Sequence, residues 1–155
     1  FRPAPHSIVD ATGVLREICN ARHRGIVFDV GHGCQSFNFD VAEFAIQSGF
    51  MPDTISADLQ RGHIGMHPPH TLVLVASKMM AIGMPLNMVL RAITTRPIEI
   101  LEFDNDKVFR NGTPANFQIV SLGDDEQVLT DCLGSQRTGK ILTSEVVIQK
   151  GKQIR

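Results

Sequence analysis

The stretch GIVFDVGHGCQSFNFDVAEFAIQSGFMPDTISADLQ, from Gly25 to Gln60, contains two short runs rich in β-branched residues, with a helix-like segment between them. The first run, IVFDV (Ile26–Val30), is nearly all apolar, which is typical of a strand covered on both faces in a parallel sheet. The second run, DTISADL (Asp53–Leu59), follows Pro52 and predicts the next strand. The stretch therefore indicates a βα unit of a parallel sheet.

Four helices are predicted around these two strands. Apolar residues at spacings of one, three and four predict a helix from Val14 to His23. Asp40 followed by Glu43 has the spacing of a capping box and predicts a helix from Val41 to about Ser48. The other two helices are expected at Thr71–Ile82, which is apolar enough to be buried against a sheet, and from Pro85 to Thr95.

Polar residues stand at the ends of both predicted strands. His32 follows the first strand between two glycines, whose backbone a ligand can approach closely, and Asp58 lies at the end of the second. Because neighbouring parallel strands end at the same edge, we expect both residues to face one mouth. Asp58 is a candidate metal ligand or proton carrier, or else it caps the following turn. His32 is a candidate substrate donor or metal ligand, or else an ordinary loop histidine.

From about Pro97 the pattern changes to short runs typical of strands. Polar segments separate these runs at Asn105–Lys107, Arg110–Pro114 and Gly123–Asp125, and a hairpin is expected about Lys150 and Gly151. The predicted strands are IEILEF (98–103), FQIVSL (117–122), EQVLTD (126–131) and SEVVIQ (144–149). The sequence therefore predicts two parts, an α/β part over residues 1–96 and a small all-β part over residues 97–155.

The composition limits the classes of partner. The chain has 155 residues, 43% of them hydrophobic, with 15 Lys and Arg against 16 Asp and Glu. This is about one ordinary domain, and without a basic excess we expect neither nucleic acid nor a membrane surface as a partner. No apolar run approaches the roughly 20 residues of a spanning helix, and the first residues lack the pattern of a signal peptide, so we expect a cytoplasmic protein.

The cysteines and the remaining histidines give weaker signals. Cys19, Cys34 and Cys132 are widely spaced, which fits neither a disulfide framework nor a zinc motif, and buried or idle thiols are expected. His63, His67 and His70 would share one face of a helix and could then bind a metal, but two prolines forbid that helix. A polar loop over the mouth is the preferred interpretation.

Several strings resemble those of a known family. FDVGHGCQSFNFDVAEFAIQSGFMPDTISADLQ, SKMMAIGMPL and DCLGSQRTGK are similar to the C-terminal part of the amidohydrolase/deacetylase, or dihydroorotase-like, metallohydrolases of the amidohydrolase superfamily. The resemblance runs from about Arg2 to the end, and the first string is specific. It implies that residues 1–96 form the last βα units of a (β/α)8 barrel of the TIM type, followed by a small β-sandwich.

The resemblance also implies a site. Such enzymes hold a divalent metal pair, usually zinc, with histidines, a carboxylated lysine and one aspartate, and the aspartate corresponds to Asp58. Asp58 is then expected to bind metal and to pass a proton from the bridging hydroxide to the leaving group. His32 and the adjacent Gly33 are expected to contact a small substrate through its carbonyl or carboxylate. The implied reaction is hydrolysis of an amide or ester bond in an acylated molecule.

The chain departs from the family pattern in ways that bear on activity. The other metal ligands have no counterpart, and a catalytic zinc takes about three protein ligands, so this chain alone is expected to be inactive. Gln60 and Asn116 stand where the family usually has histidine and aspartate. The apolar edge at Ile26–Val30 invites pairing, so we expect a homo-oligomer or association with a missing N-terminal half. The alternative function is a catalytically silent binding or oligomerisation module.

Overall fold

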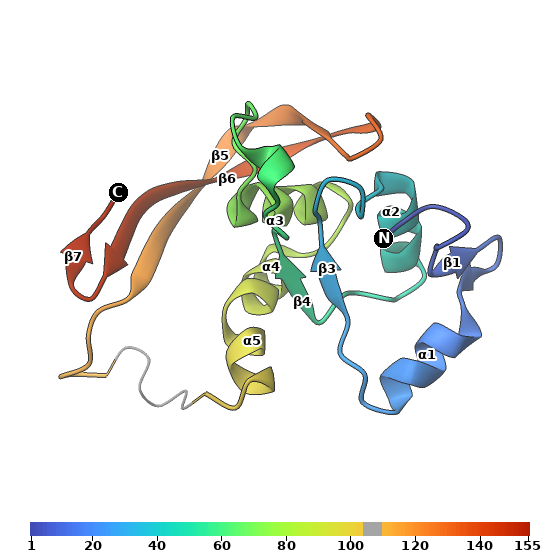
Figure 1. Ribbon diagram of the computed structural model, residues 1–155, viewed down its shortest axis with the longest axis horizontal. Helices are drawn as coiled ribbons and strands as arrows, with labels where there is room; N and C mark the ends of the chain where they lie inside the picture. Colours follow the sequence, from blue (N-terminus) through green and yellow to red (C-terminus); the bar gives the residue numbers. More distant parts are fainter. Residues whose placement is uncertain (104–109) are drawn as a thin grey trace.

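The computed structural model describes residues 1–103 and 110–155 and has a mixed α/β architecture (Figure 1), which confirms the predicted class. The elements in chain order are β1 (Val9–Asp10), β2 (Gly13–Val14), α1 (Arg16–His23), β3 (Asp29–Gly31), α2 (Phe39–Gln47), β4 (Thr54–Ser56), the 3-10 helix η1 (Arg61–His63), α3 (Leu72–Ala81), α4 (Leu86–Ile93), α5 (Thr95–Ile100), β5 (Phe117–Thr130), β6 (Gln136–Gln149) and β7 (Lys152–Gln153).

The parallel pair of β3 and β4 lies at the centre of the fold (Figure 1). Val30 pairs with Ile55, and both side chains are buried in the hydrophobic core. Helix α2 connects the two strands, so the predicted βα unit is confirmed. Strand β3 nevertheless begins three residues later than the sequence predicts, and Ile26 and Val27, which the pattern predicts to be covered, are exposed. In the part of the chain that the structure describes, β3 and β4 have no other strand neighbours. The core beside them is filled by Phe37, Phe39, Val75, Met79 and Val89.

Helix α2 begins two residues earlier than the capping box predicts. Asn38 is its N-cap, and the Asn38 side chain accepts a hydrogen bond from the Val41 N–H at 3.0 Å. Asp40 and Glu43 instead form ion pairs with Arg137 of β6, at 2.7 Å and 2.8 Å. The predicted capping box is therefore wrong, because both carboxylates are directed to a residue that is distant in the sequence.

A buried carboxylate fastens the β5–β6 hairpin to α2. Asp131 Oδ2 accepts hydrogen bonds from the Phe39 N–H at 2.9 Å and the Asn38 side-chain amide at 3.1 Å. Asp131 Oδ1 accepts the N–H groups of Leu133 and Ser135 at 2.8 Å and 2.9 Å. Only 8% of Asp131 is exposed, and these donors make its burial tolerable. The turn after β5 is thereby held at the N-terminus of α2, where negative charge is favourable.

Strand β6 crosses helix α3 at close range. Ser77 Oγ accepts the Leu142 N–H at 2.9 Å and donates to the Val73 carbonyl at 2.7 Å. A Cβ added to Gly139 would lie 2.7 Å from the Ala81 Cβ, so only glycine fits at this crossing. Figure 1 shows β5 and β6 passing over α3, with the β7 end of the sheet extending beyond the helices. The antiparallel sheet is thus attached to the α/β part near one end.

Two predictions for the C-terminal part are wrong. The run Ile98–Phe103 is not a strand, because Thr95–Ile100 form α5, where Arg96 pairs with Glu99 one turn later at 3.1 Å. The runs Phe117–Leu122 and Glu126–Asp131 belong mainly to one strand, β5, and not to two. The expected turn between them is instead a shift of register between Leu122 and Glu126, which the long partner strand β6 accommodates.

The predicted hairpin at Lys150 and Gly151 is confirmed. Both residues have positive φ angles, 50° and 77°, as a tight two-residue hairpin requires, and Gln149 pairs with Lys152 across the turn. The turn predicted at Asn105–Lys107 lies outside the described residues. The boundary near residue 96 and the β-sandwich stay predictions. Over the described ranges, no helix is long and apolar enough to cross a membrane.

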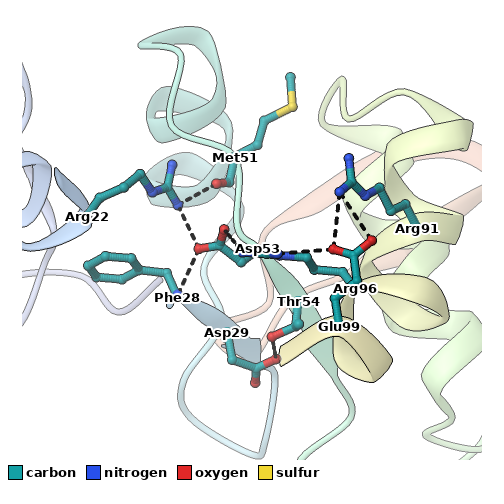
Figure 2. Close-up of polar contacts among 9 residues, drawn as sticks. All are labelled: Arg22, Phe28, Asp29, Met51, Asp53, Thr54, Arg91, Arg96 and Glu99. Carbon is teal, nitrogen blue, oxygen red and sulfur yellow. Dashed lines mark hydrogen bonds and ion pairs between the residues drawn. The ribbon is translucent and has the colours of Figure 1, made fainter. Parts of the chain in front are cut away.

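Figure 2 shows an ion-pair cluster at the start of β4, away from the carboxyl edge of the strand pair. The Asp53 carboxylate accepts the Phe28 N–H, just before β3, at 2.9 Å. It also pairs with Arg22 of α1 at 3.4 Å and with Arg96 of α5 at 3.7 Å. The Arg22 guanidinium lies over the Phe50 ring, 3.7 Å from its centroid. The cluster connects two helices to the beginning of the strand pair.

Replacing Asp131 with alanine tests the attachment of the hairpin. Asp131→Ala leaves buried N–H donors without an acceptor, and we expect the free energy of unfolding to fall by roughly 3 kcal/mol. Urea unfolding followed by circular dichroism measures the change. Asp124→Ala, at an exposed position of β5, is the matched control and should change stability by less than about 0.5 kcal/mol. Equal losses in the two variants would contradict the anchoring role.

Candidate functional site

The carboxyl ends of β3 and β4 lie side by side. Their contacts continue past the strands, since the His32 N–H donates to the Ser56 carbonyl at 3.4 Å and the Gly33 N–H donates to the Ala57 carbonyl at 3.2 Å. The segments that carry His32 and Asp58 therefore meet at one edge, as the βα unit predicts. This edge is the candidate functional site.

Asp58 is exposed and adopts a left-handed backbone conformation with φ of 47°. Its Oδ2 atom accepts a hydrogen bond from the Gln60 side-chain amide at 3.1 Å. A Cβ added to Gly33 would overlap Asp58 Oδ2, and Gly33 itself has a φ of 50°. Glycine at position 33 therefore lets the two segments approach, while the Asp58 carboxylate keeps unused acceptor capacity.

The described residues do not form a metal site by themselves. No group of three or more His, Cys, Asp or Glu side chains among them is arranged to hold a metal ion. The accessible carboxylate of Asp58 has the chemistry of one ligand, and a catalytic zinc needs about two more from protein. The assignments of Asp58 as metal ligand and catalytic residue, and of His32 and Gly33 as substrate contacts, stay predictions.

His32 is only 4% exposed and both of its ring nitrogens are engaged. Its Nδ1–H donates to the Gly33 carbonyl at 2.8 Å, so Nε2 of the neutral ring is an acceptor, and it receives a hydrogen bond from Lys78 Nζ at 2.7 Å. Burial first, and then the charge of Lys78, lowers the pKa of His32 to about 4. In this tautomer Nε2 has no hydrogen to donate, so donation to a substrate oxygen would require a different tautomer.

Two histidines of the loop before α3 fold inward. His63 and His70 are buried, and their rings stack with centroids 3.9 Å apart. The His70 Nε2–H donates to the Ala57 carbonyl at 2.8 Å, and His63 Nδ1 accepts the Gln60 N–H at 2.9 Å. His67 is exposed. The loop thus lies against the carboxyl edge of the strand pair with His63 and His70 turned inward, and the three histidines do not form a metal-binding group within the described part of the chain.

A cavity of about 340 Å³ opens between this loop, helix α3 and the end of β5. Two of the residues that line this cavity, Cys34 and Cys132, were given no functional role from the sequence. Cys34 is exposed, with its Sγ 3.4 Å from His63 Nε2. Cys132 is half-buried, and its Sγ lies 3.7 Å from His32 Nδ1. All three cysteines of the chain are free thiols in the structure.

Lys78 is the most significant residue that the sequence analysis missed. It is a buried cation on α3 that meets His32 from across the core. The signal was present in the sequence, because Lys78 is the only charged residue in the apolar helix LVLVASKMMA. Charged residues are rarely buried without a partner, so such an isolated cation is worth examining as a functional candidate.

Two solved structures of enzymes match the chain over most of its length. The solved structure of an adenine deaminase matches with a TM-score of 0.86 and 27% identity, covering 99% of this chain and 42% of that chain. The structure of a dihydroorotase matches with a TM-score of 0.78 and 31% identity, covering 90% of this chain and 39% of that chain. No family model matches the chain.

The curated relatives of the chain are named deacetylases. The chain is 37% identical over 120 residues to a deacetylase of Brucella anthropi, with 77% of this chain and 29% of that protein aligned. It is 30% identical over 142 residues to a deacetylase of Enterococcus faecalis, with 90% of this chain and 38% of that protein aligned. The chain thus spans about a third of the length of these relatives. It belongs to the amidohydrolase superfamily and corresponds to the C-terminal part of its relatives.

The burial of neutral His32 predicts a pH dependence of stability. In the unfolded chain His32 binds a proton near its ordinary pKa of 6.5, but in the folded chain only near 4. Between these values the unfolded state holds more protons, so the free energy of unfolding decreases as the pH falls. From pH 7 to pH 4.5, His32 should account for about 2 to 3 kcal/mol of this loss.

Urea unfolding at the two pH values measures this effect. The loss in the free energy of unfolding from pH 7 to pH 4.5 should be smaller in His32→Gln than in the unmodified chain by about 2 to 3 kcal/mol. Some pH dependence should remain in this variant, because burial also lowers the pKa of His70. His6→Gln, at an exposed position, is the control and should keep the difference of the unmodified chain. An unchanged difference in His32→Gln would show that His32 does not remain neutral in the folded protein.

Proposed function

We propose that the chain is the C-terminal portion of a metal-dependent deacetylase of the amidohydrolase superfamily. In this proposal it supplies the last βα units of a (β/α)8 barrel, and the complete enzyme hydrolyses an amide or ester bond of a small acylated molecule. The observation that supports it is the exposed Asp58 carboxylate at the carboxyl end of β4, next to Gly33, in a chain whose curated relatives are deacetylases.

The proposed cofactor is a divalent metal, zinc, with Asp58 as one of its ligands. A metal bound there would supply Lewis-acid activation of water and of the scissile carbonyl. Asp58 would hold a proton taken from the attacking water and deliver it to the leaving amine or alcohol. Asp58 has a left-handed backbone just past β4, and the Gln60 side-chain amide donates to its Oδ2 atom. Because the described residues do not complete the ligand set, the chain alone is proposed to be inactive.

Asp58→Asn tests this function in a protein that joins this sequence to the N-terminal part found in the relatives. The amide cannot accept a proton as a carboxylate does, so kcat for hydrolysis of an acetylated substrate should fall about 1000-fold or more. The variant should keep the thermal unfolding midpoint within a few degrees, because the side chain is exposed. Asp124→Asn on β5 is the control with unchanged kcat, and near-normal turnover in Asp58→Asn would remove the proposed role.

A second candidate function is a binding or oligomerisation module. Ile26 and Val27, just before β3, are 52% and 40% exposed, and among the described residues β3 pairs only with β4. An apolar segment beside an unpaired strand edge favours association with another copy or with an N-terminal half. Whether the partner is another copy of the chain or an N-terminal half, it would pack against the unpaired edge of β3.

Native mass spectrometry of the chain, with metal content measured on the same sample, tests the association. We expect a dimer or larger species at about 10 μM protein, and Val27→Lys should shift it toward monomer because a charge disfavours edge pairing. Lys152→Met, distant in the fold at β7, is the control variant and should leave the mass unchanged. A monomer in the unmodified chain would contradict self-association at this edge.

A further inference from the structure

Lys78 is a buried cation that has no carboxylate partner among the described residues. Only 6% of Lys78 is exposed, and its hydrogen-bonded partner is the Nε2 atom of His32, a neutral acceptor at 2.7 Å. No carboxylate in the described ranges forms an ion pair with Lys78. Burial of an uncompensated ammonium is costly, and accordingly burial lowers the pKa of Lys78. An anion placed against Nζ would remove this cost, since the ammonium has further N–H donors.

A carboxylate that lines the same cavity is not available for this task. Asp131 also lines the cavity, but each of its oxygens already accepts two hydrogen bonds, all from the hairpin turn or the start of α2. Burial lowers the pKa of Lys78, while Cys132 and, after it, the negative charge of Asp131 raise it by less. Lys78 therefore lines the cavity with a positive charge that forms no ion pair with any residue that the structure describes.

The rest of the cavity suits a small organic anion. His32, His63 and His70 contribute polar rings, and Met66, Leu74 and Val128 line it with apolar side chains. The volume of about 340 Å³ lies within the range of small-molecule sites. Gly33 belongs to the lining and lies next to the Asp58 carboxylate, so the cavity adjoins the residue proposed to carry out the chemistry.

We propose that this cavity binds the carboxylate group of a small ligand, with the Lys78 ammonium as its counter-ion and the neighbouring apolar side chains holding its hydrocarbon part. The binding of a carboxylate is inferred from the cavity itself, and only the source of that carboxylate rests on the proposed deacetylase function. Hydrolysis of an acylated molecule releases a carboxylic acid, and an acylated substrate can also carry a carboxylate of its own. The two sources share the same chemistry at Lys78 and are separated by the experiment below.

The test is an NMR titration of the ¹⁵N-labelled chain with two matched pairs of ligands at constant pH and ionic strength. Acetate is compared with acetamide, which has nearly the same shape and no charge. N-acetylglycine is compared with N-acetylglycinamide in the same way. A carboxylate accepts a charge-assisted hydrogen bond from the buried ammonium of Lys78, and this bond is stronger than one to a neutral amide. The carboxylate that occupies the site should therefore bind about tenfold more tightly than the matching amide. Sodium chloride in place of the ligand shows the effect of an unspecific anion.

Variants assign the preference to Lys78. Lys78→Met should abolish the tenfold preference and leave the affinity for the amides unchanged, and Lys78→Arg should restore part of it because the charge is kept. Lys140→Met, at an exposed position of β6, is the matched control and should keep the preference. Thermal unfolding of each variant shows whether it is folded. If Lys78→Met does not fold, the comparison of acid with amide in the unmodified chain still decides.

A preference for N-acetylglycine over its amide would assign the site to a carboxylate of the substrate, and a preference confined to acetate would assign it to the released acid. Equal affinity for acid and amide in both pairs, or an effect that sodium chloride reproduces, would overturn the inference. The titration does not depend on hydrolysis. A negative result therefore leaves the proposed deacetylase function standing, and an inactive complete enzyme leaves Lys78-dependent binding standing.

Discussion

The parallel register of β3 and β4 is the constraint on which the candidate site depends. Gly31 pairs with Ser56, and the next two residues of each chain segment stay in contact beyond the strands. A slip of one residue would turn every side chain of a strand to its other face and would separate Gly33 from Asp58. The close approach at that point also requires a residue without a side chain. The position of the Asp58 carboxylate thus follows from a short piece of backbone pairing.

The antiparallel hairpin depends on contacts over long sequence distances. Asp131 connects its turn to α2, Ser77 and Gly139 fit β6 against α3, and Arg137 pairs with two carboxylates of α2. These contacts bring Cys132 to His32, one hundred positions away in the sequence. The cavity beside Lys78 exists because the hairpin is held over the carboxyl edge of the strand pair. Stability and site geometry therefore share the same anchoring residues.

The site combines two chemically different environments. Asp58 is accessible to solvent, as its proposed roles of metal ligand and proton carrier require, whereas His32 and Lys78 are buried and form a hydrogen bond with each other. A neutral histidine is a weak counterpart for a buried ammonium, which is the physical basis for expecting an external anion. Membership of the amidohydrolase superfamily is consistent with an aspartate at the end of a strand, and Lys78 adds a feature that the assignment of Asp58 does not explain.

The sequence by itself determined the local features. The apolar run at Ile26–Val30, the following helix and the run at Asp53–Leu59 correctly predicted a parallel βα unit, and from it the common edge of His32 and Asp58. Lys150 and Gly151 correctly predicted a tight hairpin, because backbone preference decides such a turn. The family strings correctly indicated the superfamily. These features depend on residues that are near neighbours in the chain, and so their patterns are visible without a structure.

Only the tertiary structure decided which distant groups meet. Residues Ile98–Phe103 have β-like composition, yet the preceding helix continues almost directly into α5, where Arg96 can reach both Glu99 and Asp53. Asp40 and Glu43 have capping-box spacing, but Arg137 attracts both carboxylates. The sequence contains no pattern that predicts the pairing of His32 with Lys78 or the stacking of His63 on His70. The spacing of residues along the chain indicates local structure, but it does not indicate which side chains meet across the core.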